Sequence, residues 1–269
     1  MGLSGTTSRP FCREIAAPVE IFRIDYPDKS HAINSVFYDR QIRLDAGTYF
    51  FVDGYVTIGT DALAALADSL GHGSLAVAAS GIACNGRTMS KSNQLQPADG
   101  GVLRGALYAL RPAFIERIVE QRIRLPIGLY RGDGLLNSMA AHDLDCLSQP
   151  WLDRRILTVP AATFEIDSLS VFRFRDLRRQ FQRKVRQIRG KLESEAVKKV
   201  IYSRGYAALP RFADDLIREF LAANPLPRVP FGDRPFMGMA LRQLRTASKP
   251  DESSLRAIRV SASSYEAVA

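Results

Sequence analysis

The sequence contains no apolar run close to the ~20 residues that a helix needs to cross a bilayer. Residues 1–10 are polar and lack the apolar core of a secretion signal. Its three cysteines, Cys12, Cys84 and Cys146, lie far apart, and its three histidines share no spacing typical of a metal site. These absences argue against a disulfide scaffold and a zinc module. They predict a cytoplasmic protein with reduced, mostly buried thiols.

The composition is that of an ordinary globular protein, with 46% hydrophobic and 24% charged residues in a chain of 269. Lysine and arginine total 37 against 28 acidic residues, which gives a formal net charge of +9. This excess indicates an anionic partner, either nucleic acid, an anionic membrane surface or a phosphorylated substrate. The chain has neither basic strands interleaved with aromatic residues nor zinc-finger spacing, so nucleic acid ranks last among these partners.

The most informative stretch begins with the continuous apolar run Tyr49 to Val52 and stops at Asp53-Gly54. Such a run is typical of a strand buried on both faces, as in a parallel sheet covered by helices. Ligands of these sheets bind beyond the carboxyl ends of the strands, where Asp53 would hold a divalent cation or a ribose hydroxyl. Asp53-Gly54 is also a common turn signal, and that alternative stays open.

The surrounding pattern predicts an α/β domain over residues 18–165, after a polar lead at 1–17. Alternating or apolar runs favour strands near 18–24, 74–80, 103–110 and 156–160. Helical periodicity favours helices near 30–37, 61–70, 112–122 and 134–141.

The chain changes character in residues 166–224, which we predict to form a basic helical region. Apolar residues recur at three- and four-residue steps over 171–192, between nine arginine and lysine residues. Such a helix suits an anionic membrane surface, or it packs on the domain through its apolar stripe. A second amphipathic helix is expected near 214–223, and residues 225–269 are expected to be a loose tail.

Five short motifs follow one another in a recognisable order. They are Asp28-Lys29-Ser30-His31-Ala32-Ile33-Asn34, Phe51-Val52-Asp53-Gly54-Tyr55, the strand 105–111, Gly132-Asp133-Gly134, and the arginine-rich run 178–186. Together they resemble, over residues 18 to about 190, the family 2 glycosyltransferases. The resemblance implies a GT-A-like, mostly parallel sheet flanked by helices, with a C-terminal basic helical extension.

The resemblance implies transfer of a sugar from a nucleotide-diphosphate donor to a hydroxyl. The acceptor would be a cell-surface glycan or a lipid-linked molecule, and the enzyme would lie in the cytoplasm, peripheral at the inner face of the plasma membrane. Asp133 would be the catalytic base, because the acceptor hydroxyl must lose its proton. Asp133 is also a plausible N-cap of the helix that follows, and both interpretations stay open.

The resemblance also assigns donor-binding roles. Asp53 would hold Mn²⁺ or Mg²⁺, which neutralises the charge of the leaving diphosphate. Lys29 and Asn34 would contact the nucleotide, and Arg183 and Arg186 the diphosphate. For Lys29 and for most of the basic residues, a solvated charged face is the competing interpretation.

The chain departs from the family pattern at three points. Tyr55 replaces the second acid of the metal-binding motif, and Gly132 replaces the acid before the catalytic one. No segment before Pro18 matches the first β-α-β unit of the family. The alternative function is therefore a non-catalytic accessory subunit of the same fold, or a truncated or split transferase that needs a partner subunit.

Overall fold

The computed structural model describes residues 20–39, 47–71, 74–85, 101–166, 174–226 and 229–260, with backbone only for 174–180. The predicted lead at 1–17 and Cys12 lie outside these residues. The chain divides into two compact units, one of residues 1–27 and 248–269 and the other of Asp28–Ala247. The smaller unit contains an antiparallel pair, β1 (Ile21–Ile24) and β7 (Ala257–Val260), in which Ile21 lies opposite Val260.

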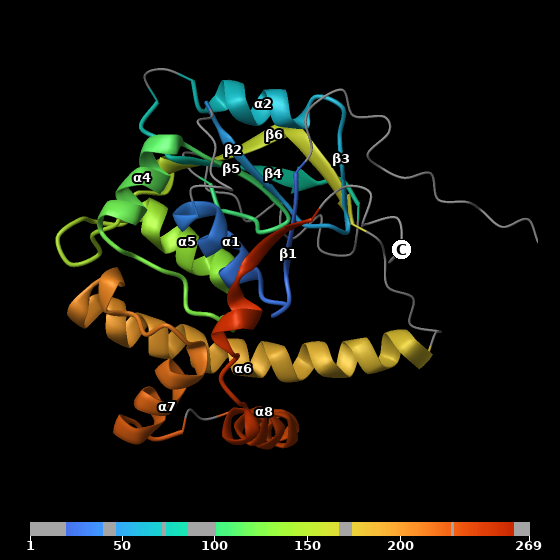
Figure 1. Ribbon diagram of the computed structural model, residues 1–269, viewed down its shortest axis with the longest axis vertical. Coiled ribbons are helices and arrows are strands. Elements are labelled where there is room, and N and C mark those ends of the chain that lie inside the picture. The colour runs from blue at the N-terminus through green and yellow to red at the C-terminus, as the bar shows by residue number, and fades with distance from the viewer. Residues whose placement is uncertain are drawn as a thin grey trace, which may run out of the picture. The chain divides into compact units, whose positions relative to one another are not determined.

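The larger unit is built on a five-stranded sheet in the order β2-β5-β4-β6-β3 (Figure 1). Its strands are β2 (Tyr49–Val52), β3 (Val56–Ile58), β4 (Ala78–Ala83), β5 (Leu107–Leu110) and β6 (Ile156–Ile166). The α/β class is confirmed, but the mostly parallel sheet is not. Among the described strands only β4 and β6 pair in parallel, while β2–β5, β4–β5 and β3–β6 are antiparallel. The run 49–52 is not buried on both faces as expected, because β2 is an edge strand with half-buried residues and Val52 is 44% exposed. An apolar run carries no information about strand direction or about whether the strand is central or at an edge.

Helices cover both faces of the sheet, with α2 on one side and α1, α4 and α5 on the other (Figure 1). Strand β5 shows why: its side chains alternate, so Leu107 and Ala109 pack toward α2 while Tyr108 and Leu110 pack toward the opposite layer. The helices are α1 (Lys29–Tyr38), α2 (Ala62–Ser69), α4 (Pro112–Glu120) and α5 (Gly132–Ala141).

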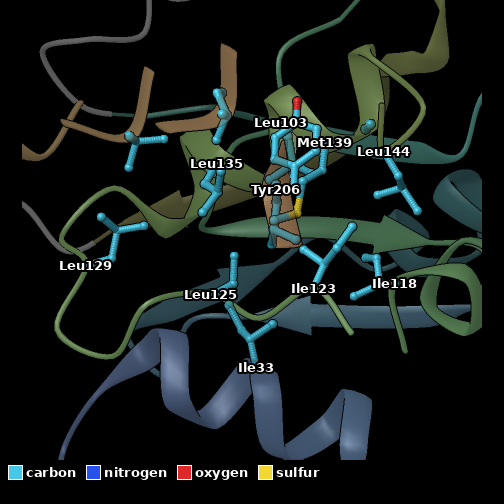
Figure 2. Packing of buried hydrophobic residues seen from close by; sticks show 14 of the residues in the cluster. Ile33, Leu103, Ile118, Ile123, Leu125, Leu129, Leu135, Met139, Leu144 and Tyr206 are labelled. Atoms are coloured by element: carbon cyan, nitrogen blue, oxygen red, sulfur yellow. The ribbon is translucent and has the colours of Figure 1, made fainter. Parts of the chain in front are cut away.

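The larger of the two layers is a single apolar cluster (Figure 2). It joins Ile33 of α1, Ile118 of α4, Leu135 and Met139 of α5, and Tyr206 of the 3₁₀ helix Tyr206–Ala208. Burial of each such side chain stabilises the fold by about 1.5–3 kcal/mol. This cluster fixes the starts of α1 and α5 relative to the sheet, and these two helix starts carry candidate site residues.

The basic helix predicted at 171–192 is α6 (Phe174–Arg204). Its apolar stripe is buried from Val185 onward, whereas Phe181 is 50% exposed. Ile188 and Leu192 pack with residues of α7 (Ala213–Ala223) and α8 (Arg234–Thr246), while Val200 joins the cluster under the sheet. The stripe is therefore used inside the protein. Of the two interpretations of this helix, membrane binding and packing on the domain, packing accounts for these buried residues. No helix in the described ranges is both long and apolar enough to cross a membrane.

The expectation of a loose tail at 225–269 is corrected by α8 and β7. Met237, Ala240 and Leu244 of α8 are spaced by three and four residues, and all three are buried. The proline, arginine and serine content of the segment hid this short stripe. Short 3₁₀ helices complete the fold at Asp153–Arg155, Tyr206–Ala208, Phe231–Asp233 and Glu252–Leu255.

Candidate functional site

The start of α1 is fixed by Asp28, which precedes it. One carboxylate oxygen of Asp28 accepts the His31 backbone N–H at 2.7 Å, which caps the helix. The other oxygen accepts the Gly128 N–H at 3.0 Å, which ties the helix to the loop before α5. Burial raises the pKa of Asp28 and these two hydrogen bonds oppose the rise. Lys29, the first residue of α1, is thereby held in one place.

Asp53 lies at the carboxyl end of β2, as predicted. Its backbone N–H donates to Ala106 O at 3.0 Å, so the pairing with the chain before β5 continues to this residue. Its carboxylate accepts two side-chain donors: Lys29 Nζ at 2.5 Å on Oδ1 and the Tyr55 hydroxyl at 2.8 Å on Oδ2. The Asp53 side chain is only 17% exposed, whereas that of Lys29 is 47% exposed.

Gly105 brings Asp133 to the same place. Lys29 Nζ also donates to Gly105 O, at 2.6 Å. On its other side, a Cβ added to Gly105 would lie 3.0 Å from Asp133 Oδ2 and 3.1 Å from Asp133 Cβ. The absence of a side chain here lets the first turn of α5 approach the chain that leads into β5. Lys29, Asp53 and Asp133 therefore gather around Gly105, and we call these four residues the Lys29 cluster.

The carboxylates of the Lys29 cluster raise the pKa of two neighbouring tyrosines, Tyr55 and Tyr108. Burial, the hydrogen bond to Asp53 and the charges of Asp53 and Asp133 together raise the pKa of Tyr55 to about 12. Burial, with the same two carboxylates, also raises the pKa of Tyr108. The Tyr108 ring stacks on Phe51 with centroids 4.8 Å apart, and its buried hydroxyl has no hydrogen-bond partner among the described residues. The charges of Asp53 and Asp133 thus act on the same two tyrosines, Tyr55 and Tyr108.

Helix α6 supports the loop that leads to Asp133. Glu193, which is fully buried, accepts the Tyr130 backbone N–H at 2.8 Å and pairs with Arg189 Nε at 2.8 Å. Arg189 in turn binds Asp214 of α7 at 2.7 Å. A Cβ on Gly190 would lie 2.8 Å from the Tyr130 ring, so helix and loop are in close contact.

This support brings one of the two predicted diphosphate-binding arginines to the loop. The Arg186 guanidinium lies 5.8 Å from the centre of the Tyr130 ring. Arg183 lies about one turn earlier in α6 and is exposed. The structure thus places Arg186 beside Tyr130, in the loop that leads to Asp133.

Asn34 has a structural task. Its side-chain amide donates to Leu125 O at 2.8 Å and accepts the Leu125 N–H at 3.0 Å, and the residue is 5% exposed. Both ends of the amide are used to hold the segment that follows α4. A nucleotide contact by Asn34 stays a prediction that this geometry does not support.

Sequence reasoning missed Gly105 O, Tyr108, Tyr130 and Glu193 as parts of the site. Gly105 and Tyr108 lie in the motif 105–111, to which the sequence assigned no site role, and Glu193 lies beside Leu192 and Ala196 on the apolar stripe of α6. An acid at such a position is expected to be paired.

The expected divalent cation does not fit the residues at Asp53. Each oxygen of its carboxylate already accepts a donor, and Tyr55 supplies a phenol where a second acid would stand. Within the described ranges no three side chains of histidine, cysteine, aspartate or glutamate gather in a way that would hold a metal ion. The assignment of Asp53 as metal ligand is therefore not supported by its surroundings.

No protein-family model matches this chain, and no curated protein matches it. Among solved structures it is similar to a mannosyltransferase from Pyrobaculum calidifontis, determined in complex with GDP-mannose and Mn²⁺. The two share 17% sequence identity over 81% of this chain and 61% of that one, with a TM-score of 0.43. This chain thus spans less than two thirds of that protein's length. Likeness at this level establishes neither a family nor an activity, so the case for function rests on the site.

Proposed function

We propose that this protein is a glycosyltransferase that moves a sugar from a nucleotide-diphosphate donor to a hydroxyl of a glycan or lipid-linked acceptor. The observation that carries the proposal is the convergence of Lys29, Asp53 and Asp133 around Gly105, at the carboxyl end of β2. These residues come from three separate segments of the chain. Acidic and basic side chains collected in this way supply both of the functions that sugar transfer needs, a proton acceptor and charge neutralisation.

Asp133 is the proposed base. As the acceptor oxygen bonds to the anomeric carbon, the acceptor proton passes to the Asp133 carboxylate and the bond to the nucleotide diphosphate breaks. Asp133 Oδ1 accepts the Gly134 N–H at 3.0 Å. The other oxygen, Oδ2, lies next to Gly105. The positive charge of Lys29 lies where it can interact with the departing diphosphate.

The test is turnover of a panel of nucleotide sugars, measured as release of the nucleoside diphosphate. For the active donor we expect Asp133→Asn to lower kcat about 10²–10⁴-fold with little change in KM, because a general base acts in the transition state. The matched control is Asp68→Asn, an exposed acid on α2, which should retain wild-type kcat. Full activity of Asp133→Asn would remove Asp133 from the mechanism.

A second candidate function is a non-catalytic accessory subunit with the same fold. It is favoured by one observation, that both oxygens of Asp53 are already engaged by Lys29 and Tyr55. This candidate predicts binding of glycan or of a partner transferase without turnover of any donor in the panel. Release of nucleoside diphosphate by the purified protein alone would exclude it.

A further inference from the structure

We propose that the Lys29 ammonium stands where a divalent cation would bind Asp53, so that this site binds a diphosphate group without metal. The inference rests on the proposed function and specifies how the donor is held.

The first argument is the occupation of Asp53. A cation bound to this carboxylate would have to displace Lys29 Nζ, which lies 2.5 Å from Oδ1, or remain next to its positive charge. The other oxygen accepts the Tyr55 hydroxyl. Mg²⁺ requires near-octahedral oxygen ligands and usually takes one or two carboxylates from protein. With Lys29 and Tyr55 in place, a cation would find only the remaining lone pairs of Asp53, next to the Lys29 ammonium.

The second argument is that Lys29 is held firmly and still has a donor to offer. An ammonium group carries three N–H donors, of which Asp53 and Gly105 O take two. The side chain is 47% exposed, so the third N–H faces a side that a ligand can reach. The backbone of Lys29 is anchored through Asp28, which caps α1 and binds Gly128. Little conformational entropy remains to be lost when an anion binds.

The third argument concerns the chemistry of Tyr55. A phenol that keeps its proton at neutral pH is no anionic ligand for a metal, but it fixes the Asp53 carboxylate toward Lys29. The Arg186 guanidinium, near Tyr130, adds a second positive charge on the side of α6. Lysine and arginine are common phosphate-binding residues and need no metal for this purpose.

The experiment separates metal binding from anion binding. Inorganic pyrophosphate is titrated calorimetrically into the full-length protein in EDTA, and Mn²⁺ alone is titrated with detection by electron paramagnetic resonance. We expect the wild type to bind pyrophosphate in EDTA and to show no Mn²⁺ binding that is lost in Asp53→Asn. Lys29→Ala should weaken pyrophosphate binding by at least about tenfold, the order expected for a lost hydrogen bond to a charged group.

Three further variants make the test independent of folding defects. Lys29→Arg keeps the charge and should retain part of the affinity for pyrophosphate. Lys198→Ala removes another paired lysine, 3.5 Å from Glu195 on α6, and should bind pyrophosphate like the wild type. The double variant Lys29→Ala/Tyr55→Asp removes the ammonium and restores a second acid, so it should gain Mn²⁺ binding.

The inference is overturned if the wild type binds Mn²⁺ through Asp53, if EDTA abolishes pyrophosphate binding, or if Lys29→Ala binds pyrophosphate as tightly as the wild type. Turnover of a nucleotide sugar only with added Mn²⁺ would overturn it and leave the glycosyltransferase proposal standing. Pyrophosphate binding in EDTA without turnover of any donor would support metal-free binding and contradict the glycosyltransferase proposal.

Discussion

Lys29 joins three parts of the chain at one atom. Its ammonium group contacts the end of β2 through Asp53 and the chain before β5 through Gly105, and its backbone opens α1. The ion pair with Asp53 is partly shielded from water, because the carboxylate is 17% exposed. Shielding makes such a pair stronger than the exposed ion pairs elsewhere on the surface, which contribute about 0–1 kcal/mol each.

At Gly105, the addition of a single methyl group should lower the activity of the enzyme. In Gly105→Ala the new methyl group would lie 3.0–3.2 Å from the Asp133 side chain, so the carboxylate must shift by a few tenths of an ångström. We expect kcat to fall about tenfold or more, because reacting groups displaced by a fraction of an ångström lose catalytic geometry. Thermal stability should change little.

Gly134→Ala is the matched control for Gly105→Ala. A Cβ at Gly134 would lie 3.9 Å from Arg131 Cβ, an ordinary contact, and alanine keeps the N–H that Asp133 accepts. Equal loss of activity in both variants would show that any added methyl group in this region is harmful, and would contradict the specific role of Gly105.

At the scale of elements, Asp143 fastens the end of α5 to its neighbours. Its side chain accepts Arg117 of α4 at 2.8 Å and Arg155 at 2.5 Å, and its backbone adopts a φ of +53°. Burial opposes ionisation of Asp143, but the hydrogen bonds from the two arginines prevail and hold its pKa below the usual value. The carboxylate therefore stabilises the folded state.

Asp143→Asn should lower the free energy of unfolding at pH 7 by about 1.5–3 kcal/mol, the range for hydrogen bonds to charged groups. Asparagine tolerates a positive φ, so the substitution tests charge rather than backbone strain. The difference from the wild type should be full above the ordinary aspartate pKa and vanish as the pH falls through the lowered pKa, because protonated Asp143 has lost its charge. Denaturant unfolding across this pH range measures it. A difference that persists unchanged below that range, or that Asp68→Asn reproduces, would contradict the role of the charge.

Helix α6 connects the elements that carry the site with the C-terminal helices. Its end joins the core under the sheet, its middle supports the Tyr130 loop through Glu193, and its apolar stripe packs with α7 and α8. From Val185 onward the apolar face of the helix is therefore packed inside the protein, and its basic face points outward. Exposed basic residues on it include Arg183, Arg186, Lys191, Lys198 and Lys199.

At the scale of the whole molecule, the net charge of +9 is the property most open to test. We propose peripheral binding to anionic membrane surfaces, through charge, since Ile188 and Leu192 of the α6 stripe are buried against α7 and α8. The protein should sediment with phosphatidylserine-rich vesicles at low salt and be released by about 0.5 M NaCl, because screening removes such attraction. Binding to neutral phosphatidylcholine vesicles, or binding that salt does not release, would contradict an electrostatic mechanism.

The sequence alone determined most of the elements of residues 20–224 and the position of Asp53 after β2. The apolar run ending at Asp53 became β2, the stripe beginning in 171–192 became α6, and the α/β class followed from alternating short and long periods. It did not reveal α8 in the segment 225–269, because the three buried residues of that helix stand in a segment rich in proline, arginine and serine.

The tertiary structure alone decided which residues meet. Strand direction, the approach of Asp133 to Gly105 and the capture of Asp53 by Lys29 all join segments that lie 24 or more residues apart. The local sequence pattern shows the spacing of apolar residues, and hence the type of element, because this spacing involves near neighbours along the chain. Whether a carboxylate faces a metal or a lysine depends on which distant segment packs beside it, and only the packed core determines that.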